Sequence, residues 1–216
     1  MSASTAVAGQ RQSVLELYRD DGPLARALGT TLGARIGLPA VMLVAAAAVP
    51  LLTVMALGGD DVPRLAVGAA VAWLVVVGAL SQGRALSGRF AWTVPPLLRL
   101  VEYGGLAWFA VLAGASAVPG AFALLAAVAF RHYDIVYRLR YQGVAPPPWV
   151  GRVGAGWEGR LVIGFALLAA GALPEGFFIA GGLLAIVFVA ESVAGWTRLA
   201  RAQRPELYSD EEEVEE

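Results

Sequence analysis

The sequence contains no cysteine, no lysine and only one histidine, His132. Without cysteine the chain forms no disulfide, no thiolate nucleophile and no cysteine-based metal site. A single histidine also excludes a multi-histidine metal site. All sixteen basic residues are arginine. Exclusive use of arginine is typical of GC-rich coding, so part of it reflects mutational bias and carries no function.

Charged residues are scarce too, at 15% of the 216 residues, whereas 58% are hydrophobic. The hydrophobic residues come in long runs, which indicates a membrane protein rather than a soluble domain. We therefore predict an all-α, polytopic membrane protein with six transmembrane helices, preceded by an amphipathic N-terminal helix. The predicted spans are residues 38–58, 63–82, 94–115, 118–140, 159–173 and 176–199.

The region before the first span combines apolar and charged side chains. Residues 11–20 have the pattern of a short amphipathic helix lying on the membrane surface. Pro23 suits the first turn of a following helix, with Asp21 or Gly22 as its cap. The expected organisation is a disordered segment at 1–10, an amphipathic or juxtamembrane helical segment at 11–37, a membrane domain at 38–204 and an acidic disordered tail at 205–216.

Three glycines in this region, Gly29, Gly33 and Gly37, recur at four-residue spacing. This spacing favours close packing between helices through small residues. The alternative is a close approach of the backbone to a phosphate, assisted by Arg26 and Arg35.

Arginine is distributed unevenly over the connections between the predicted spans. The short connections 59–62, 116–117 and 174–175 contain none, whereas the other connections and both flanking regions are rich in it. By the positive-inside rule, both termini are expected to be cytoplasmic, in the cytoplasmic (inner) membrane of a bacterium. The first apolar run begins only near Leu38, too late for a typical secretory signal peptide.

The stretch Phe130–Tyr141 continues the fourth predicted span into charged residues. Arg131, Asp134 and Arg138 lie at i, i+3 and i+7, and therefore share one face of a helix. If Arg140 lies at the membrane surface, Arg131 lies about 13 Å deeper. Ionisable groups at that depth are costly and normally face a partner or a polar cavity.

Other predicted spans carry charges at a similar depth. We expect Glu102, Asp134 and Glu191 to share one interior space with Arg131 or Arg99 within ion-pair reach. Counting Arg35, arginine outnumbers acid in this set by five to four. The arginines are Arg35, Arg99, Arg131, Arg138 and Arg160, and the acids are Glu102, Asp134, Glu158 and Glu191.

This arginine surplus predicts an anionic ligand, because the guanidinium fork suits phosphate. The predicted ligand-binding residues are Arg99, Arg131, Arg138, Arg160 and Tyr137. The predicted catalytic residues, which would act as acids or bases or bind Mg²⁺, are Asp134, Glu102, Glu191 and His132. The alternative is structural: Arg99 with Glu102, and Asp134 with Arg131 or Arg138, form closed ion pairs that lock helices together.

Six spans with both ends inside and a charged cytoplasmic cavity resemble the architecture of CDP-alcohol phosphotransferases. The aspartate signature of that family, D-x2-D-G-x2-A-R followed by G-x3-D-x3-D, is absent. The corresponding region reads Ala79–Ser87 and Pro95–Tyr103 and contains no aspartate. Asp21–Arg26 matches part of the signature by letters, but no second half follows it. The resemblance therefore transfers no catalytic residue.

Three other stretches resemble an uncharacterised membrane domain found at the C-terminal end of bacterial chains that also hold such a phosphotransferase and a nucleotidyltransferase. They are Leu17–Gly22, Arg131–Arg138 and Gly156–Arg160. This resemblance implies a setting in phospholipid or polyprenyl-phosphate metabolism, without a known activity.

The leading functional hypothesis is binding or processing of a phosphate-bearing lipid or nucleotide-linked headgroup at the cytoplasmic face. A small anion transporter and a non-catalytic membrane scaffold for a phospholipid synthase are the alternatives. Whether the protein is an enzyme stays open. The expected partners are membrane lipid and either a second copy of the chain or a synthase, with no nucleic acid.

Overall fold

The structure, a computed structural model, describes residues 14–59 and 62–212, with side chains up to residue 201. The expectation for residues 1–10 lies outside the described residues. Six helical segments are long and apolar enough to cross a membrane, and no strand occurs in the part of the chain described. The predicted all-α, six-span fold is confirmed. Its spans are α3 (Ala40–Leu57), α4 (Arg64–Leu80), α5 (Val94–Ala113), α6 (Val118–Tyr141), α7 (Pro148–Val153) with α8 (Gly156–Ala170), and α9 (Leu173–Glu212).

Proline and glycine mark several helix boundaries. Pro23 is the first residue of α2 (Pro23–Thr31), and Gly22 is its N-cap, as the sequence predicts. Helix α8 ends at Gly171, whose left-handed φ of 71° stops the helix. Helix α9 begins two residues later and continues through residues 205–212, where we expected a disordered tail.

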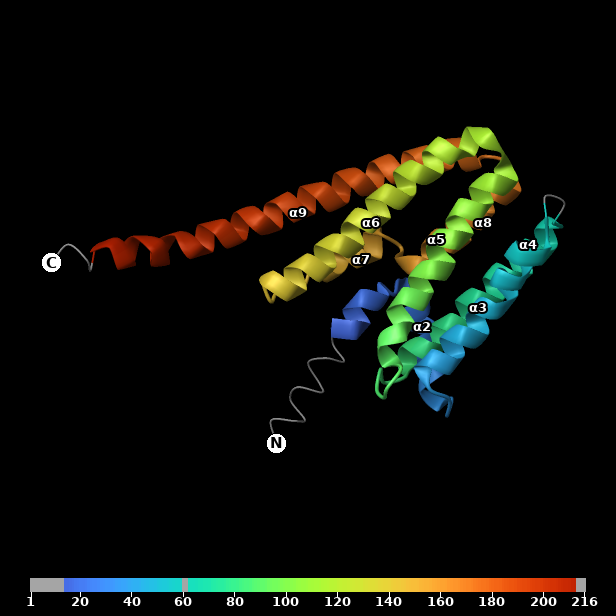
Figure 1. Cartoon of the computed structure of the whole chain (residues 1–216), viewed down its shortest axis with the longest axis horizontal. Helices are drawn as coiled ribbons and strands as arrows, with labels where there is room; N and C mark the ends of the chain where they lie inside the picture. Colours follow the sequence, from blue (N-terminus) through green and yellow to red (C-terminus); the bar gives the residue numbers. More distant parts are fainter. Residues whose placement is uncertain (1–13, 60–61, 213–216) are drawn as a thin grey trace.

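The spans form two groups that diverge from a common end (Figure 1). Helices α6 and α9 pack side by side along most of their shared length, while α3, α4, α5 and α8 form the second group. The groups meet at the end that carries the short connections α5–α6 and α8–α9. The N-terminal helix, residues 14–19, and α2 lie between the groups at the opposite end, here called the arginine-rich end.

Glycine allows α6 and α9 to approach closely. A Cβ added to Gly181 of α9 would lie 2.7 Å from the backbone nitrogen of Leu124 in α6. A Cβ on Gly120 of α6 would lie 2.8 Å from the carbonyl oxygen of Pro174. Small residues at such contacts are how membrane helices gain packing energy without a hydrophobic driving force between them.

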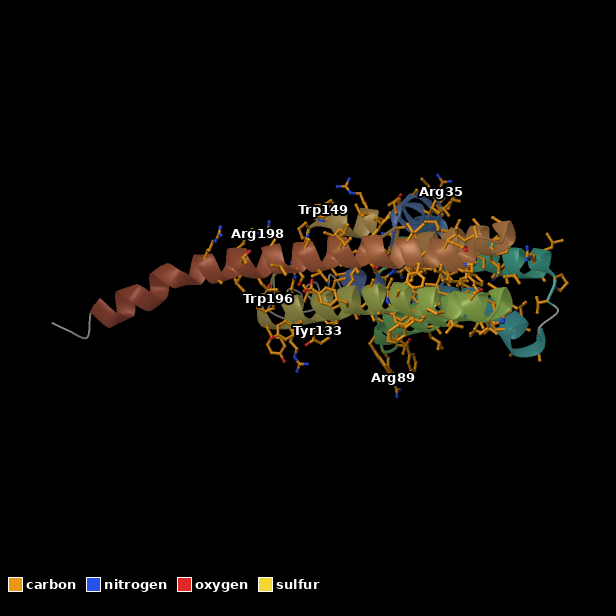
Figure 2. All side chains as sticks on the ribbon, turned by 90° about the horizontal axis from the view of Figure 1, so that it is seen from above. Arg35, Arg89, Tyr133, Trp149, Trp196 and Arg198 are labelled. Atoms are coloured by element: carbon orange, nitrogen blue, oxygen red, sulfur yellow. The ribbon has the colours of Figure 1, made fainter. Side chains whose placement is uncertain are left out.

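Large apolar side chains cover the outside of the spans. Leu65, Phe122 and Ile186 are 85%, 76% and 69% exposed, respectively, which suits a surface solvated by lipid. Figure 2 shows Arg35 and Arg198 pointing away from the helices. The outer surface is therefore apolar along the spans, with outward-pointing arginines toward the arginine-rich end.

The glycines at four-residue spacing act in packing at two of their three positions. Gly29 of α2 faces Gln82 and Gly83, and Gly33 faces the carbonyl of Leu80, so neither has room for a side chain. Gly37 has no atom within 4 Å of an added Cβ. Close packing of α2 against the end of α4 is therefore confirmed for Gly29 and Gly33.

Candidate functional site

The end of the N-terminal helix enters the protein instead of lying on the membrane surface. Arg19, Asp20 and Asp21 are only 1%, 6% and 7% exposed. The prediction of a surface helix is therefore wrong for this end of it. The amphipathic pattern identified the helix, but the pattern could not show that its terminal charges meet arginines of the spans.

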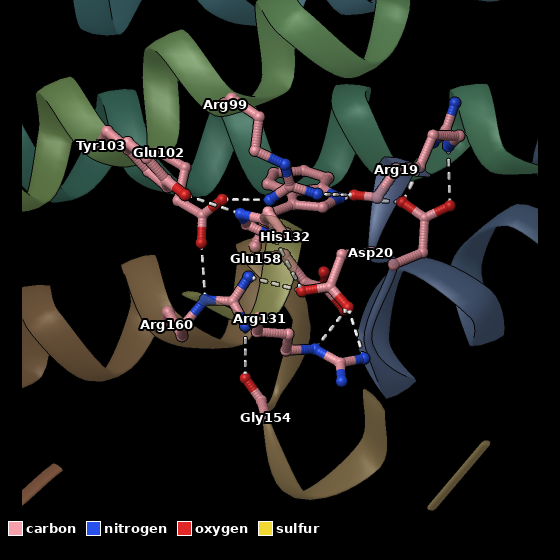
Figure 3. A network of polar contacts seen from close by, with 12 residues as sticks. Arg19, Asp20, Arg99, Glu102, Tyr103, Arg131, His132, Gly154, Glu158 and Arg160 are labelled. Atoms are coloured by element: carbon pink, nitrogen blue, oxygen red, sulfur yellow. Dashed lines mark hydrogen bonds and ion pairs between the residues drawn. The ribbon is translucent and has the colours of Figure 1, made fainter. Parts of the chain in front are cut away.

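Asp20 is held by two arginines and a histidine from two spans (Figure 3). Arg131 of α6 donates to Oδ1 from Nη2 at 3.0 Å and from Nε at 3.3 Å. Arg160 of α8 donates from Nη2 to Oδ2 at 2.9 Å, and Nε2 of His132 lies 3.3 Å from the same oxygen. Both carboxylate oxygens of Asp20 therefore have hydrogen-bond partners, as the oxygens of a bound anion would have.

Electrostatics keep Asp20 ionised. Burial alone would raise its pKa, but Arg160, the hydrogen bond from His132, Arg131 and Arg99 together hold the pKa of this carboxyl well below its usual value. The network therefore depends on a charged Asp20.

Glu102, which is fully buried, connects Asp20 to α5. Arg160 donates from Nε to Glu102 Oε1 at 2.5 Å, and Arg99 pairs with the other oxygen. Arg99 also donates to the backbone carbonyls of Tyr18, at 3.1 Å, and Arg19, at 2.5 Å. The predicted pair of Arg99 with Glu102 is confirmed, and the same arginine fastens the N-terminal helix.

His132 is oriented by Tyr103, because its Nδ1 lies 2.6 Å from the tyrosine hydroxyl. If Nε2 donates to Asp20, neutral His132 accepts at Nδ1 from Tyr103.

Neighbouring contacts hold Asp21 and α2. Arg19 donates from Nε to Asp21 at 2.7 Å and from Nη2 to Ser81 at 2.9 Å. The indole nitrogen of Trp157 donates to Asp21 at 2.8 Å. Glu158 accepts from the backbone nitrogens of Gly22, at 3.1 Å, and Ala25, at 3.0 Å, and so caps α2.

A second cluster joins α6 to α9. Arg138 donates to Glu191 from Nη1 at 3.1 Å and from Nη2 at 2.9 Å, and its Nε lies 2.9 Å from Asp134. The Nε hydrogen has no hydrogen-bonding geometry, so the contact with Asp134 is an ion pair only. Ser192 donates to the other oxygen of Asp134 at 2.8 Å.

The predicted site is therefore divided. Glu102, Arg99, Arg131, His132 and Arg160 belong to the first cluster, and Asp134, Glu191 and Arg138 belong to the second. The expectation of one space shared by Glu102, Asp134 and Glu191 is wrong. Tyr137 packs against Tyr141 and Trp196, with ring centroids 4.6 and 5.4 Å away, and Arg35 is exposed, outside both clusters.

The arginine surplus disappears in the folded protein. In the first cluster, the arginines and the acids are equal in number, at four each: Arg19, Arg99, Arg131 and Arg160 against Asp20, Asp21, Glu102 and Glu158. Asp20 and Asp21 were missed as site residues, although they lie in one of the three stretches that carry the family resemblance. All three stretches meet in this cluster.

No group of three or more His, Asp or Glu side chains within residues 14–59 and 62–201 is arranged to hold a metal ion. Of the acids proposed as Mg²⁺ ligands, Glu102 lies in the first cluster and Asp134 and Glu191 lie in the second, and all three face arginines. The residues present do not fit the predicted metal role.

A polar cavity of about 390 Å³ lies beside the first cluster, between the N-terminal helix, α2 and the segment that follows α4. Arg19, Arg26 and Arg84 line it, together with Asp21 and Gln82. Arg19 Nη1 is buried and has no hydrogen-bond partner among the described residues, and the same holds for Arg84 Nε.

Comparison with known proteins identifies a protein family. A model described as a family of unknown function, DUF5941, matches residues 9–212. No curated protein and no solved structure matches the chain.

Proposed function

We propose that this chain, which belongs to the family of unknown function DUF5941, binds a phosphate-bearing headgroup of a lipid or a nucleotide-linked molecule at the cytoplasmic face of the inner membrane. The arginine-rich end supplies the site, and the positive-inside rule puts that end in the cytoplasm. The family resemblance supports a setting in phospholipid or polyprenyl-phosphate metabolism.

The observation that carries this proposal is the buried Nη1 of Arg19, which has no hydrogen-bond partner among the described residues and belongs to a side chain that lines the polar cavity. A buried N–H group without a partner is costly, and most such groups in proteins are paired. Arg84 has a second buried donor without a partner, and exposed Arg26 lines the same cavity. Guanidinium groups suit the oxygens of a phosphate.

The residues proposed to bind the ligand therefore differ from those predicted from the sequence, and they line the neighbouring cavity. Arg99, Arg131, Arg138 and Arg160 already hold carboxylates of the chain, whereas Arg19, Arg26 and Arg84 line open space. The cavity supports recognition of the headgroup. Two acids, Glu16 and Asp21, also line the cavity, so its three arginines leave a surplus of one positive charge. Asp21 is already engaged by Arg19 and Trp157.

A second candidate is a non-catalytic scaffold for a phospholipid synthase. It is favoured by the ion pairs of the predicted catalytic acids: Glu102 is fully buried, and Asp134 and Glu191 both face Arg138. Such closed pairs fasten α5 to α8 and α6 to α9, which is the role the structural alternative expects.

The experiment measures binding of phosphatidic acid, with phosphatidylcholine as the zwitterionic control, to the purified protein in detergent or nanodiscs. Arg84→Met and Arg26→Met each remove one lining cation and should weaken phosphatidic acid binding about tenfold. Inorganic phosphate added as competitor shows whether the phosphate group alone is recognised.

Arg89→Met is the matched control. Arg89 is exposed in the same connection as Arg84, lies 5.4 Å from the Phe90 ring and does not line the cavity. Its loss should leave binding unchanged. Equal losses in the Arg84 and Arg89 variants would indicate general charge attraction and reject the cavity. Retained binding in both cavity variants would leave the scaffold as the better account.

A further inference from the structure

A cationic site within the spans is filled by a carboxylate that comes from outside them. Arg131, His132 and Arg160 belong to α6 and α8, whereas Asp20 follows the N-terminal helix. The three side chains converge on both oxygens of one buried carboxylate (Figure 3).

The charges of the spans alone are unbalanced here. Without the N-terminal segment, residues 14–22, the spans contribute Arg99, Arg131 and Arg160 against Glu102 and Glu158, a surplus of one positive charge. A carboxylate or a phosphate neutralises this surplus. A phosphate monoester also has more oxygens, which suit arginine forks.

We propose that Arg131, Arg160 and His132 form an anion-binding site for a phosphate monoester, and that Asp20 is its tethered occupant, which the phosphate displaces. The site is distinct from the cavity lined by Arg19 and Arg84, and the inference does not rest on ligand binding there. Displacement frees the N-terminal segment from α6 and α8, so ligand binding changes the surface presented at the arginine-rich end.

Asp20 has a left-handed φ of 51°, which aspartate tolerates. One feature of the site favours exchange over a permanent lock. A small cavity of about 60 Å³, lined by Asp20, Arg26 and Arg131, reaches the site beside Pro146–Pro148. This cavity admits molecules of the size of water. A phosphate fits between Arg131 and Arg160 only after the Asp20 carboxylate leaves.

The first test uses two Asp20 variants with the full chain in detergent. Asp20→Gly removes the carboxylate and tolerates the positive φ. Asp20→Asn, the matched control, also tolerates this φ and removes the charge but still fills the space. Inorganic phosphate, titrated at constant ionic strength, should raise the Tm of Asp20→Gly saturably by at least about 3 °C. It should raise the Tm of Asp20→Asn less, and that of Asp20→Gly/Arg131→Met not at all.

The second test needs no variant and covers the case in which Asp20→Gly fails to fold. Hydrogen exchange of residues 14–22 is measured in wild-type protein with phosphatidic acid vesicles, with phosphatidylcholine vesicles and with free phosphate. Displacement predicts exchange at least about threefold faster with a phosphate monoester than with phosphatidylcholine. Acceleration by phosphatidic acid alone assigns the ligand to lipid, and acceleration by both anions assigns it to the phosphate group.

Unchanged exchange with both anions overturns the proposal, because Asp20 is then a permanent part of the fold. A folded Asp20→Gly protein that shows no saturable response to phosphate overturns it as well. Arg84→Met leaves Arg131, Arg160 and His132 intact. A loss of ligand binding at the cavity in this variant can therefore be distinguished from a loss of phosphate binding at the Asp20 site.

Discussion

Arg138 and Glu191 face each other across the contact between α6 and α9, joined by two hydrogen bonds of 3.1 and 2.9 Å. Both are nearly buried, at 3% and 7% exposed. A buried ion pair adds little net stability, but removing one partner strands a charge. The pair is therefore a sensitive place to distinguish structural from ligand-binding roles.

Substitution of these two residues should have unequal effects. Arg138→Met leaves Asp134 without its cation and Glu191 with only the largely exposed Arg198, 3.6 Å away. We expect a loss of about 3–5 kcal/mol. Glu191→Leu should cost less, because Asp134 still neutralises Arg138. The measurement is the free energy of unfolding of each variant in mixed micelles. A larger loss for Glu191→Leu would contradict this assignment of partners.

The sequence predicted the six spans well because each depends on the length of an apolar run, which is a local property. It also predicted that charges from several spans lie at a similar depth. It did not predict their partners. Asp134 shares a helix face with Arg131 and Arg138, and Arg138 is the one that reaches it, since helical side chains point toward the N terminus of the helix. Arg131 points away from Asp134 and reaches Asp20, 111 residues earlier.

The site residues missed from the sequence are those of the N-terminal segment. Hydrophobic periodicity describes one helix at a time. Residues 11–20 therefore have the pattern of a surface helix whether or not their C-terminal end is buried. The signal that is present is the charge count. Arginine exceeds acid among the spans, while Asp20 ends the predicted amphipathic helix and Asp21 is only a candidate helix cap. Carboxylates of the chain itself therefore supply much of the negative charge that the arginine surplus predicted.

Two adjacent glycines in α9 allow a controlled test of helix packing. Gly181→Ala places a Cβ 2.7 Å from the Leu124 backbone nitrogen, which has to move, whereas Gly182→Ala meets nothing within 4 Å. We expect Gly181→Ala to destabilise the protein by about 1–3 kcal/mol. Gly182→Ala should be neutral or slightly stabilising, because alanine favours helix. Equal effects on the unfolding free energy would show that α6 and α9 do not pack this closely.

Stability should depend on pH through Asp20. Folding lowers the pKa of this carboxyl, so its contribution is fully present above its unfolded pKa of about 3.9. The contribution is lost as the pH falls below that value toward the folded pKa, where Asp20 becomes protonated in both states. Thermal unfolding of the wild type between pH 3 and pH 7 should therefore show a steeper loss below about pH 4 than Asp20→Asn does. Parallel curves would show that Asp20 gains no stabilisation from its cationic partners.

The orientation in the membrane is the last prediction and follows from arginine. The connection that follows α4 carries Arg84 and Arg89, and the last turn of α6 carries Arg138 and Arg140, whereas the short connections at the opposite end carry no arginine. Since positively charged loops are retained in the cytoplasm, reporters inserted within residues 142–152 or fused after Glu216 should give cytoplasmic signals. A reporter at Asp60-Asp61 should be external. A cytoplasmic signal at Asp60 would be incompatible with six spans in this orientation, and would also remove the cytoplasmic placement on which the proposed headgroup binding depends.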